Sequence, residues 1–424
     1  MREGISPLTA LRARLDSGAV DAVGVAREFG ARANGNALGN TYLRFDLASL
    51  EEEAAGLAKG GALYGVPVSI KDCFDVAGTV TTCGARYYAD HNPVAARDSA
   101  VAERLREAGY LITGKTHLHP LAYGITGQNE FFGDCLQPRD AALLTGGSSS
   151  GAAASVQEGS ALAAIGTDTG GSVRVPAALC GLVGFRASQG FPGKAWPEMW
   201  RGGHHLAPSF DTLGLLFRDT RDAVALVGGV FGISVAKPRG LRIGCVNESW
   251  MGDCEASVIA AYRGWKESLV AAGAVVEEFV PVGWEESLEI FAGIQAHEAA
   301  GLHRGHYAEF EGPIAQRLAW GESLTAASVA LLKERRVAFC AGMDGLLERF
   351  DFLMMPCAPV SRLLVGADQS AVRTAILRYT TPVSLAGLPV VALPGKEFGT
   401  GVQVIGRRGA EGELLGFLEA VGLG

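Results

Sequence analysis

The chain has 424 residues, of which 48% are hydrophobic, and it carries a formal net charge of −8. This length and apolar content allow one large α/β domain or two to three ordinary domains. The acidic balance argues against nucleic acid as a direct partner. The eight cysteines form no CxxC pair and lack the spacing of a zinc site or of a disulfide scaffold, so we expect buried, reduced thiols and no metal.

The N-terminus lacks the apolar segment of a signal peptide. No charge-free apolar run approaches the ~20 residues that span a membrane. We therefore expect a cytoplasmic protein that makes no membrane contact.

Helical and strand patterns alternate through the first half of the chain. The expected elements are helices at 7–29 and 48–59, a strand at 63–70, a helix at 100–108, a strand at 110–113, a helix at 151–158 and a strand at 161–165. Ser99 is a suitable N-cap for the helix that Gly109 ends. The strands are short continuous apolar runs, which indicates a sheet covered by helices on both faces.

The second half returns to the same alternation after a helical stretch. Its expected elements are a strand within 236–246, a helix at 255–272, a strand at 275–280, mostly helix over 282–349, and strand patterns at 351–359 and 382–405. The predicted fold class is therefore α/β, with a large central mixed, mostly parallel sheet. We expect one domain over 1–424, with an N-terminal helical segment (1–60) and a helical cap or insertion (244–349).

The segment 144–190 contains two serine clusters flanked by glycines, around Ser148 and Ser172, and almost no charge. Glycine reaches positive φ without penalty, so such a backbone can bend tightly and present a serine to a substrate carbonyl. Upstream, Lys71 directly follows an apolar, strand-like run. Two serines and one lysine in this setting suggest a hydrolase that does not rely on histidine.

Three other interpretations fit the serine clusters less well. Tight turns alone would explain one cluster more easily than two. Residues 147–151 match G-x-S-x-G with Ser149 at the centre, but a nucleophile elbow needs a strand before it, and 137–142 is typical of a loop. A phosphate-binding loop is disfavoured because no G-x-x-x-x-G-K-[ST] motif is present.

The chain resembles the amidase signature family from about residue 60 to 406. The matching segments are Gly146–Gly151, Gly166–Ala177, Cys180-Gly181, Gly184–Arg186, Gly65–Asp72, Gly114–Thr116, Ser209–Gly214 and Ala386–Pro389. The resemblance implies the amidase signature fold, with Ser172 as nucleophile, Ser148 as bridging serine and Lys71 as base. It also implies that the backbone amides of Thr169, Gly170, Gly171 and Ser172 form an oxyanion hole.

Elementary chemistry supports these roles. A serine hydroxyl needs a neighbouring base, and lysine is a base only when neutral, which burial favours by lowering its pKa. Asp72 should point away from Lys71, because neighbouring strand residues face opposite sides. Ser148 would then carry the proton from Ser172 to Lys71 and later to the leaving amine. We also expect support from Ser149, and from Arg174 paired with Asp168.

The expected function is hydrolysis of a small carboxamide, with release of ammonia or an amine and without a cofactor. The alternatives are the amide-cleaving subunit of an aminoacyl-tRNA amidotransferase, which would work with a tRNA-binding partner, and a catalytically silent binding protein. The family more often has Asn and an acidic residue where this chain has His117 and His119, so their roles stay open. The acyl group, the amine and the oligomeric state also stay open, with a homodimer as one option.

Overall fold

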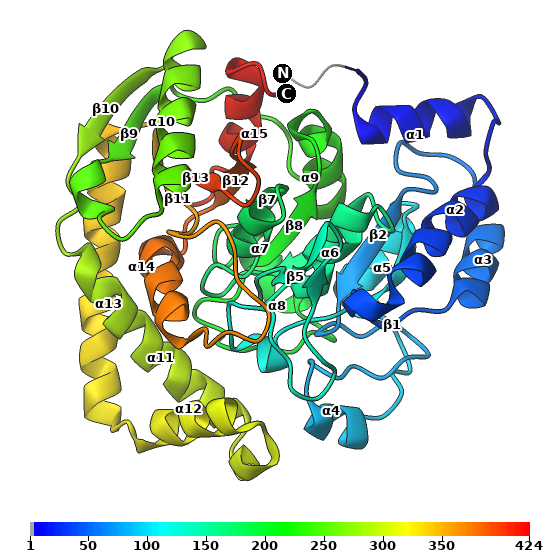
Figure 1. Cartoon of the computed structure of the whole chain (residues 1–424), viewed down its shortest axis with the longest axis horizontal. Helices are drawn as coiled ribbons and strands as arrows, with labels where there is room; N and C mark the ends of the chain where they lie inside the picture. Colours follow the sequence, from blue (N-terminus) through cyan, green and yellow to red (C-terminus); the bar gives the residue numbers. More distant parts are fainter. Residues whose placement is uncertain (1–3) are drawn as a thin grey trace.

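The computed structural model describes residues 4–424, apart from the side chains of Ala37, Lys194 and Trp196. An eleven-stranded sheet runs through the molecule, with helices on both faces (Figure 1). The strands, in their spatial order, are β1 (Tyr42–Arg44), β3 (Leu111–Thr116), β2 (Pro67–Lys71), β6 (Ala163–Thr167), β8 (Leu213–Phe217), β7 (Val183–Arg186), β12 (Val390–Pro394), β13 (Gly401–Ile405), β11 (Phe352–Pro356), β9 (Arg242–Val246) and β10 (Val275–Phe279). A separate hairpin pairs β4 (Leu136–Gln137) with β5 (Asp140–Leu144).

The large mixed sheet that the sequence predicts is confirmed, and its parallel pairs lie in two groups. One group is β3, β2 and β6, and the other is β11, β9 and β10. From β6 to β11 all neighbouring strands pair antiparallel, as β1 does with β3. The expected parallel pairing therefore holds within these two groups only. Strands β8, β7, β12 and β13 lie between the two groups in the sheet and pair antiparallel with their neighbours.

The helices follow the alternation expected from the sequence. They are α1 (Pro7–Asp16), α2 (Ala22–Gly35), α3 (Leu47–Gly56), α4 (Arg86–His91), α5 (Ala100–Glu107), α6 (Ser150–Glu158), α7 (Arg174–Leu179), α8 (Trp196–Met199), α9 (Ala223–Phe231), α10 (Ala256–Ala271), α11 (Ser287–Leu302), α12 (Gly312–Ser323), α13 (Ala326–Arg349), α14 (Ser370–Ala386) and α15 (Glu411–Ala420). Figure 1 shows α1–α3 at one end of the molecule and α11–α13 at the other.

Two expected boundaries differ from the structure. The stretch 244–349 includes β10 and most of β9, which join the central sheet with α10 between them, so its continuous helical part begins after β10 with α11. The segment 1–60, of which residues 1–3 lie outside the described residues, includes the edge strand β1 as well as helices. Edge strands of three residues carry too little pattern to be recognised from sequence.

The strand pattern expected from residue 382 begins later. Residues up to Ala386 belong to α14, and Pro382 lies inside that helix. Every residue from Tyr379 to Ala386 is buried, so the segment has no alternation of buried and exposed positions and shares this pattern with a buried strand although it is helical. Periodicity cannot separate these two cases in a short apolar segment.

The core follows the sheet. All five residues of β2, β6 and β8 are buried, as expected for strands covered on both faces. The eight cysteines are free thiols, six of them buried. No helix within residues 4–424 combines the length and apolar character needed to cross a membrane.

Candidate active site

The site lies where parallel strands β2 and β6 end. Lys71 is the last residue of β2, and Thr167 is the last residue of β6. The two strands are parallel neighbours, with Ile70 paired to Ile165. Carboxyl ends of parallel neighbours meet at one edge of a sheet, and this edge is a common place for binding sites in α/β proteins.

The Lys71 ammonium is surrounded by hydroxyl groups. Its Nζ lies 2.8 Å from Ser148 Oγ, 2.8 Å from Thr167 Oγ1 and 3.2 Å from Ser149 Oγ. The side chain is fully buried, and among the described residues no carboxylate forms an ion pair with it. Burial therefore lowers the pKa of Lys71 to about 8. A lysine of this kind exchanges its proton near neutral pH.

Asp72 points away from this site, as strand geometry predicts. Its carboxylate forms an ion pair with Lys115, 2.6 Å away, and accepts a hydrogen bond from the Thr82 amide. Both charged side chains are 1% exposed. The acidic neighbour of Lys71 is thus neutralised elsewhere and leaves the lysine without a counter-ion.

Ser148 and Ser149 lie in the turn that leads into α6. The peptide bond between Gly147 and Ser148 is cis. The Ser149 amide donates to the carbonyl oxygen of Ser172 at 3.1 Å, which ties the first serine cluster to the second. Ser149 Oγ donates to the Thr167 carbonyl oxygen at 3.2 Å, so this side chain braces the turn against the end of β6.

Asp168 organises the loop that carries Ser172. Its carboxylate accepts hydrogen bonds from the amides of Gly171 (2.8 Å) and Val173 (3.1 Å), and from Nε (3.0 Å) and Nη2 (2.9 Å) of Arg174. Arg186 Nε lies 3.2 Å from the same carboxylate. Burial alone would raise the pKa of Asp168, but the two guanidinium groups hold it well below its usual range. The carboxylate is an ionised structural centre of the loop.

Three amides of the loop are unused. Within the described residues, the amides of Thr169, Gly170 and Ser172 have no acceptor in the protein, whereas the Gly171 amide donates to Asp168. The oxyanion hole implied by the resemblance therefore has three free donors in this conformation and not four. Gly171 serves the loop in another way, because its φ of +119° is one that side chains rarely adopt.

The structure brings Lys71, Ser148 and Ser172 into one region, but among the described residues no hydrogen bond joins Ser172 Oγ to the other two side chains. Lys71 and Ser148 are directly hydrogen-bonded, whereas among the described residues Ser172 Oγ has no hydrogen-bond partner. Ser172 is 3% exposed and lines a narrow pocket. Its hydroxyl is therefore free to approach Ser148 or a substrate carbonyl.

Two residues of the site were missed by the sequence reasoning. Thr167 holds the Lys71 ammonium, and Arg186 is the second cation on Asp168. Both occupy strand ends, at the final residues of β6 and β7. Both residues lie at the same edge of the sheet as Lys71, which could have indicated them, but this edge can be recognised only when the order of the strands is known.

The two histidines near the site are neutral. Burial lowers the pKa of His117 to about 4, and its Nε2 contacts the Gly133 carbonyl oxygen at 2.9 Å. Burial, aided by the charges of Arg317 and Arg373, keeps the pKa of His119 well below its usual value. The His119 amide donates to the Ser148 carbonyl oxygen, so this residue helps to position the serine turn. In residues 4–424 no group of three or more His, Cys, Asp or Glu side chains forms a metal site.

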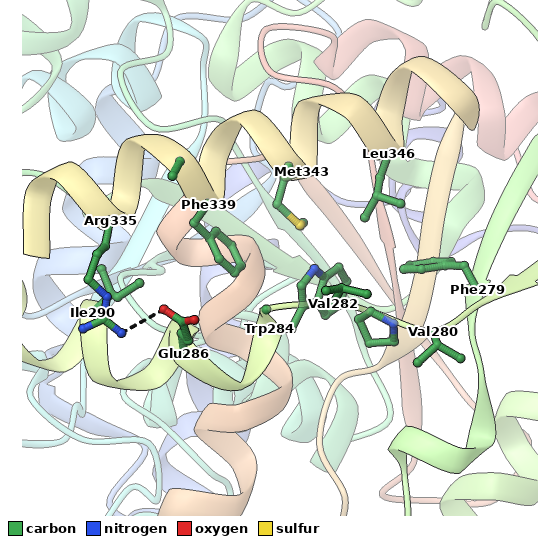
Figure 2. A pocket seen from close by; sticks show the side chains of 14 residues that line it. Phe279, Val280, Val282, Trp284, Glu286, Ile290, Arg335, Phe339, Met343 and Leu346 are labelled. Carbon is green, nitrogen blue, oxygen red and sulfur yellow. Dashed lines mark hydrogen bonds and ion pairs between the residues drawn. The ribbon is translucent and has the colours of Figure 1, made fainter.

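A larger groove lies elsewhere, between the end of β10, α11 and α13 (Figure 2). Its walls are mostly apolar, with Trp284, Phe339 and Met343 among them, and Arg335 pairs with Glu286 at 2.9 Å on its rim. No serine, lysine or histidine lines it. Size and side-chain chemistry therefore indicate different places in this protein, and the candidate site is chosen on its side chains.

Comparison with known proteins agrees with the geometry. The family model "Amidase" matches residues 27–415. The 2-amino-5-chloromuconic acid deaminase of Comamonas testosteroni is 33% identical over 89% of this chain and 87% of its own. One subunit of the glutamyl-tRNA(Gln) amidotransferase of Thermotoga maritima is 27% identical over 87% of this chain and 86% of its own. A crystal structure described as an amidase superposes with a TM-score of 0.88 at 30% identity, covering 99% of this chain and all of its own.

Proposed function

Because the chain belongs to the Amidase family and is a hydrolase acting on C–N bonds, we propose that it hydrolyses a small carboxamide through an acyl-enzyme on Ser172, with Ser148 as bridging serine and Lys71 as base. The observation that carries the proposal is the 2.8 Å hydrogen bond between Lys71 Nζ and Ser148 Oγ in a buried setting without a carboxylate partner. Among the described residues, neither the His117 ring nor the His119 ring forms a hydrogen bond with Ser148 or Ser172, and His117 Nε2 contacts the Gly133 carbonyl oxygen instead.

In the proposed first step, neutral Lys71 takes a proton from Ser148, which takes one from Ser172 as Ser172 Oγ attacks the amide carbon. The oxyanion that forms accepts hydrogen bonds from the free amides of the 169–172 loop. The proton then returns through Ser148 to the amide nitrogen, the C–N bond breaks, and ammonia or an amine leaves. Water attacks the ester by the same route and releases the carboxylic acid.

Replacement of the nucleophile tests this mechanism. Ser172→Ala should lower ammonia release from small primary amides by at least ~10⁴-fold, since the covalent route is lost, while the thermal midpoint stays near that of the parent protein. A fluorophosphonate probe should label the parent and not the variant. Ser268→Ala, on the exposed face of α10, is the matched control and should keep both activity and labelling. Full activity of the Ser172→Ala protein would refute the proposal.

One alternative has an observation in its favour, namely the likeness to the glutamyl-tRNA(Gln) amidotransferase subunit of Thermotoga maritima. In that role, the chain would cleave an amide for a partner and would be weakly active alone. The amidase crystal structure matches over nearly the full length of both chains with a TM-score of 0.88, against 0.75 for the amidotransferase subunit, and this likeness concerns the fold, so experiment must separate the two roles. Turnover of simple amides by the purified lone chain would favour the main proposal, whereas strict dependence on a co-purified partner would favour the alternative.

A further inference from the structure

The pocket at Ser172 is narrow and is built from four parts of the chain. Its lining residues are Ala122, Tyr123, Gly124, Ile125, Thr169, Gly170, Ser172, Phe291, Gln295, Arg373 and Leu377. The nucleophile and two amides of the serine loop thus face the same space as one cation, Arg373. The lining contains no aspartate or glutamate.

Arg373 is a cation without a counter-ion. It lies in the first half of α14, and its backbone is held by the Gln369 carbonyl oxygen. Its Nε is buried and has no hydrogen-bond partner, and among the described residues no acceptor contacts the rest of the guanidinium. Burial lowers the pKa of Arg373 from its usual value. A buried donor that lacks an acceptor costs free energy unless a ligand supplies one.

Arg317 adds a second positive charge behind the first. It lies on α12 and donates to the carbonyl oxygens of Tyr123 and Pro313, with its guanidinium carbon 4.8 Å from the centre of the Tyr123 ring. Burial, with Arg373 nearby, lowers the pKa of Arg317 to about 10, so it remains charged at neutral pH. The Arg317 guanidinium thus donates hydrogen bonds to carbonyl oxygens of the protein, whereas the Arg373 guanidinium has no acceptor among the described residues.

No acidic group offsets this charge in the described residues. The titratable groups that act on Arg317 are Arg373 and Tyr123, and the one that acts on Arg373 is Tyr123, with no carboxylate among them. His119, which both arginines influence, is neutral. Two partly desolvated cations beside a small cavity favour an anionic ligand, and the planar guanidinium fits a carboxylate in a bidentate manner.

We propose that this pocket takes a primary amide whose acyl chain ends in a carboxylate, the monoamide of a dicarboxylic acid, with Arg373 binding the carboxylate and Arg317 supporting it. The inference rests on the proposed function at Ser172. The reaction joins the acyl carbon to Ser172 Oγ, releases ammonia with the proton from the serine, and then adds water to give the dicarboxylate. The carboxylate belongs to the acyl part, since Arg373 lines the same narrow pocket as Thr169, Gly170 and Ser172 and can hold the acyl-enzyme after ammonia leaves.

The same charges disfavour an α-amino acid amide. An ammonium group in this pocket would find one arginine in the lining, Arg373, with Arg317 behind it, and no carboxylate among the lining residues. Glutaramate and L-glutamine differ only by that ammonium, and pentanamide replaces the carboxylate of glutaramate with a methyl group. These three amides therefore separate recognition of the carboxylate from rejection of the amine.

The test compares kcat/KM of these amides for the parent, Arg373→Met and Arg378→Met. The parent should prefer glutaramate to both pentanamide and L-glutamine by at least ~10-fold. Arg373→Met should lose roughly 10- to 100-fold on glutaramate, the range for a hydrogen bond to a charged group, and keep its activity on pentanamide. Arg378, on the same helix but paired with Asp253, is the matched control and should leave the preference unchanged. Arg373→Lys should restore part of the loss.

A binding measurement keeps this inference separate from the proposed function. Calorimetry with glutarate should show binding to the Ser172→Ala protein and loss of binding when Arg373→Met is added. If no amide is turned over but glutarate binds in this Arg373-dependent way, the carboxylate site stands and the proposed chemistry fails. Three results would overturn the inference. They are equal losses of kcat/KM on glutaramate and pentanamide in Arg373→Met, the absence of glutarate binding that depends on Arg373, and a preference for N-acetylglycine. In N-acetylglycine the carboxylate lies on the leaving amine.

Discussion

Raising the pH from 7 to 9 should activate the enzyme by deprotonating Lys71. Burial lowers the pKa of this lysine to about 8, so the neutral form should rise from about 9% at pH 7 to about 50% at pH 8 and about 91% at pH 9. Because only neutral lysine accepts the proton that Ser172 passes through Ser148, kcat/KM should increase about tenfold over this range with a slope of one per pH unit below pH 7.5.

The sign of this effect follows from the direction of the shift. A lysine with a lowered pKa loses its proton as the pH passes through about 8, and the base is then available. His117 and His119 have already lost their charge well below pH 7, so they contribute no step to this part of the profile. The rise centred near pH 8 is therefore assigned to Lys71, whereas burial lowers the pKa of Arg186 only to about 9, at the upper end of the range.

The assay is ammonia release from a neutral primary amide in a constant-ionic-strength buffer series, with kcat/KM taken at each pH. A neutral substrate is needed so that its own titration does not enter. Lys71→Met should abolish turnover over the whole range. A flat profile from pH 7 to 9, or a single rise with an apparent pKa near 6.5, would refute lysine as the base.

The remaining predictions concern the loop that carries the nucleophile. Arg174→Met removes one of the two cations from a fully buried Asp168 and should lower the free energy of unfolding by about 3–5 kcal/mol, measured by urea denaturation. Gly171→Ala places a side chain at a φ of +119° with its Cβ 2.7 Å from Thr380 Cγ2, so it should cost about 1–3 kcal/mol in stability and lower kcat at least ~10-fold.

Controls for these two variants come from the same chain. Arg335→Met removes a cation from exposed partners, Glu286 and Glu289, and should change the urea midpoint much less than Arg174→Met. Gly264→Ala, in a helix with open space where its Cβ would lie, should be tolerated. Equal effects of Arg174→Met and Arg335→Met would contradict the role of the buried pair, and a fully active Gly171→Ala protein would contradict the need for that backbone conformation.

The class of the fold, the family and the residue types of the candidate site were all predictable from the chain's local patterns and motifs. Apolar runs and glycines act locally, so the approximate places of elements such as β2, α5, α6 and α10 were predictable, and the spacing of the serine clusters is a property of the chain alone. The pairing of Arg174 with Asp168 was also predictable because the two residues lie in one short loop.

Which side chains from distant parts of the chain contact one another depends on long-range packing and could not be predicted from the sequence. The antiparallel centre of the sheet depends on the order of the strands. The C-terminal half of α14 is buried on all sides, so its sequence lacks the amphipathic pattern by which a helix is recognised. Thr167 meets Lys71 only because β2 and β6 are parallel neighbours. Arg373 and Arg317 lie 201 and 145 residues beyond Ser172 in the chain, and no local pattern places them near it. Long-range packing brings their charges to the pocket, which is why the sequence indicated an amidase without indicating its substrate.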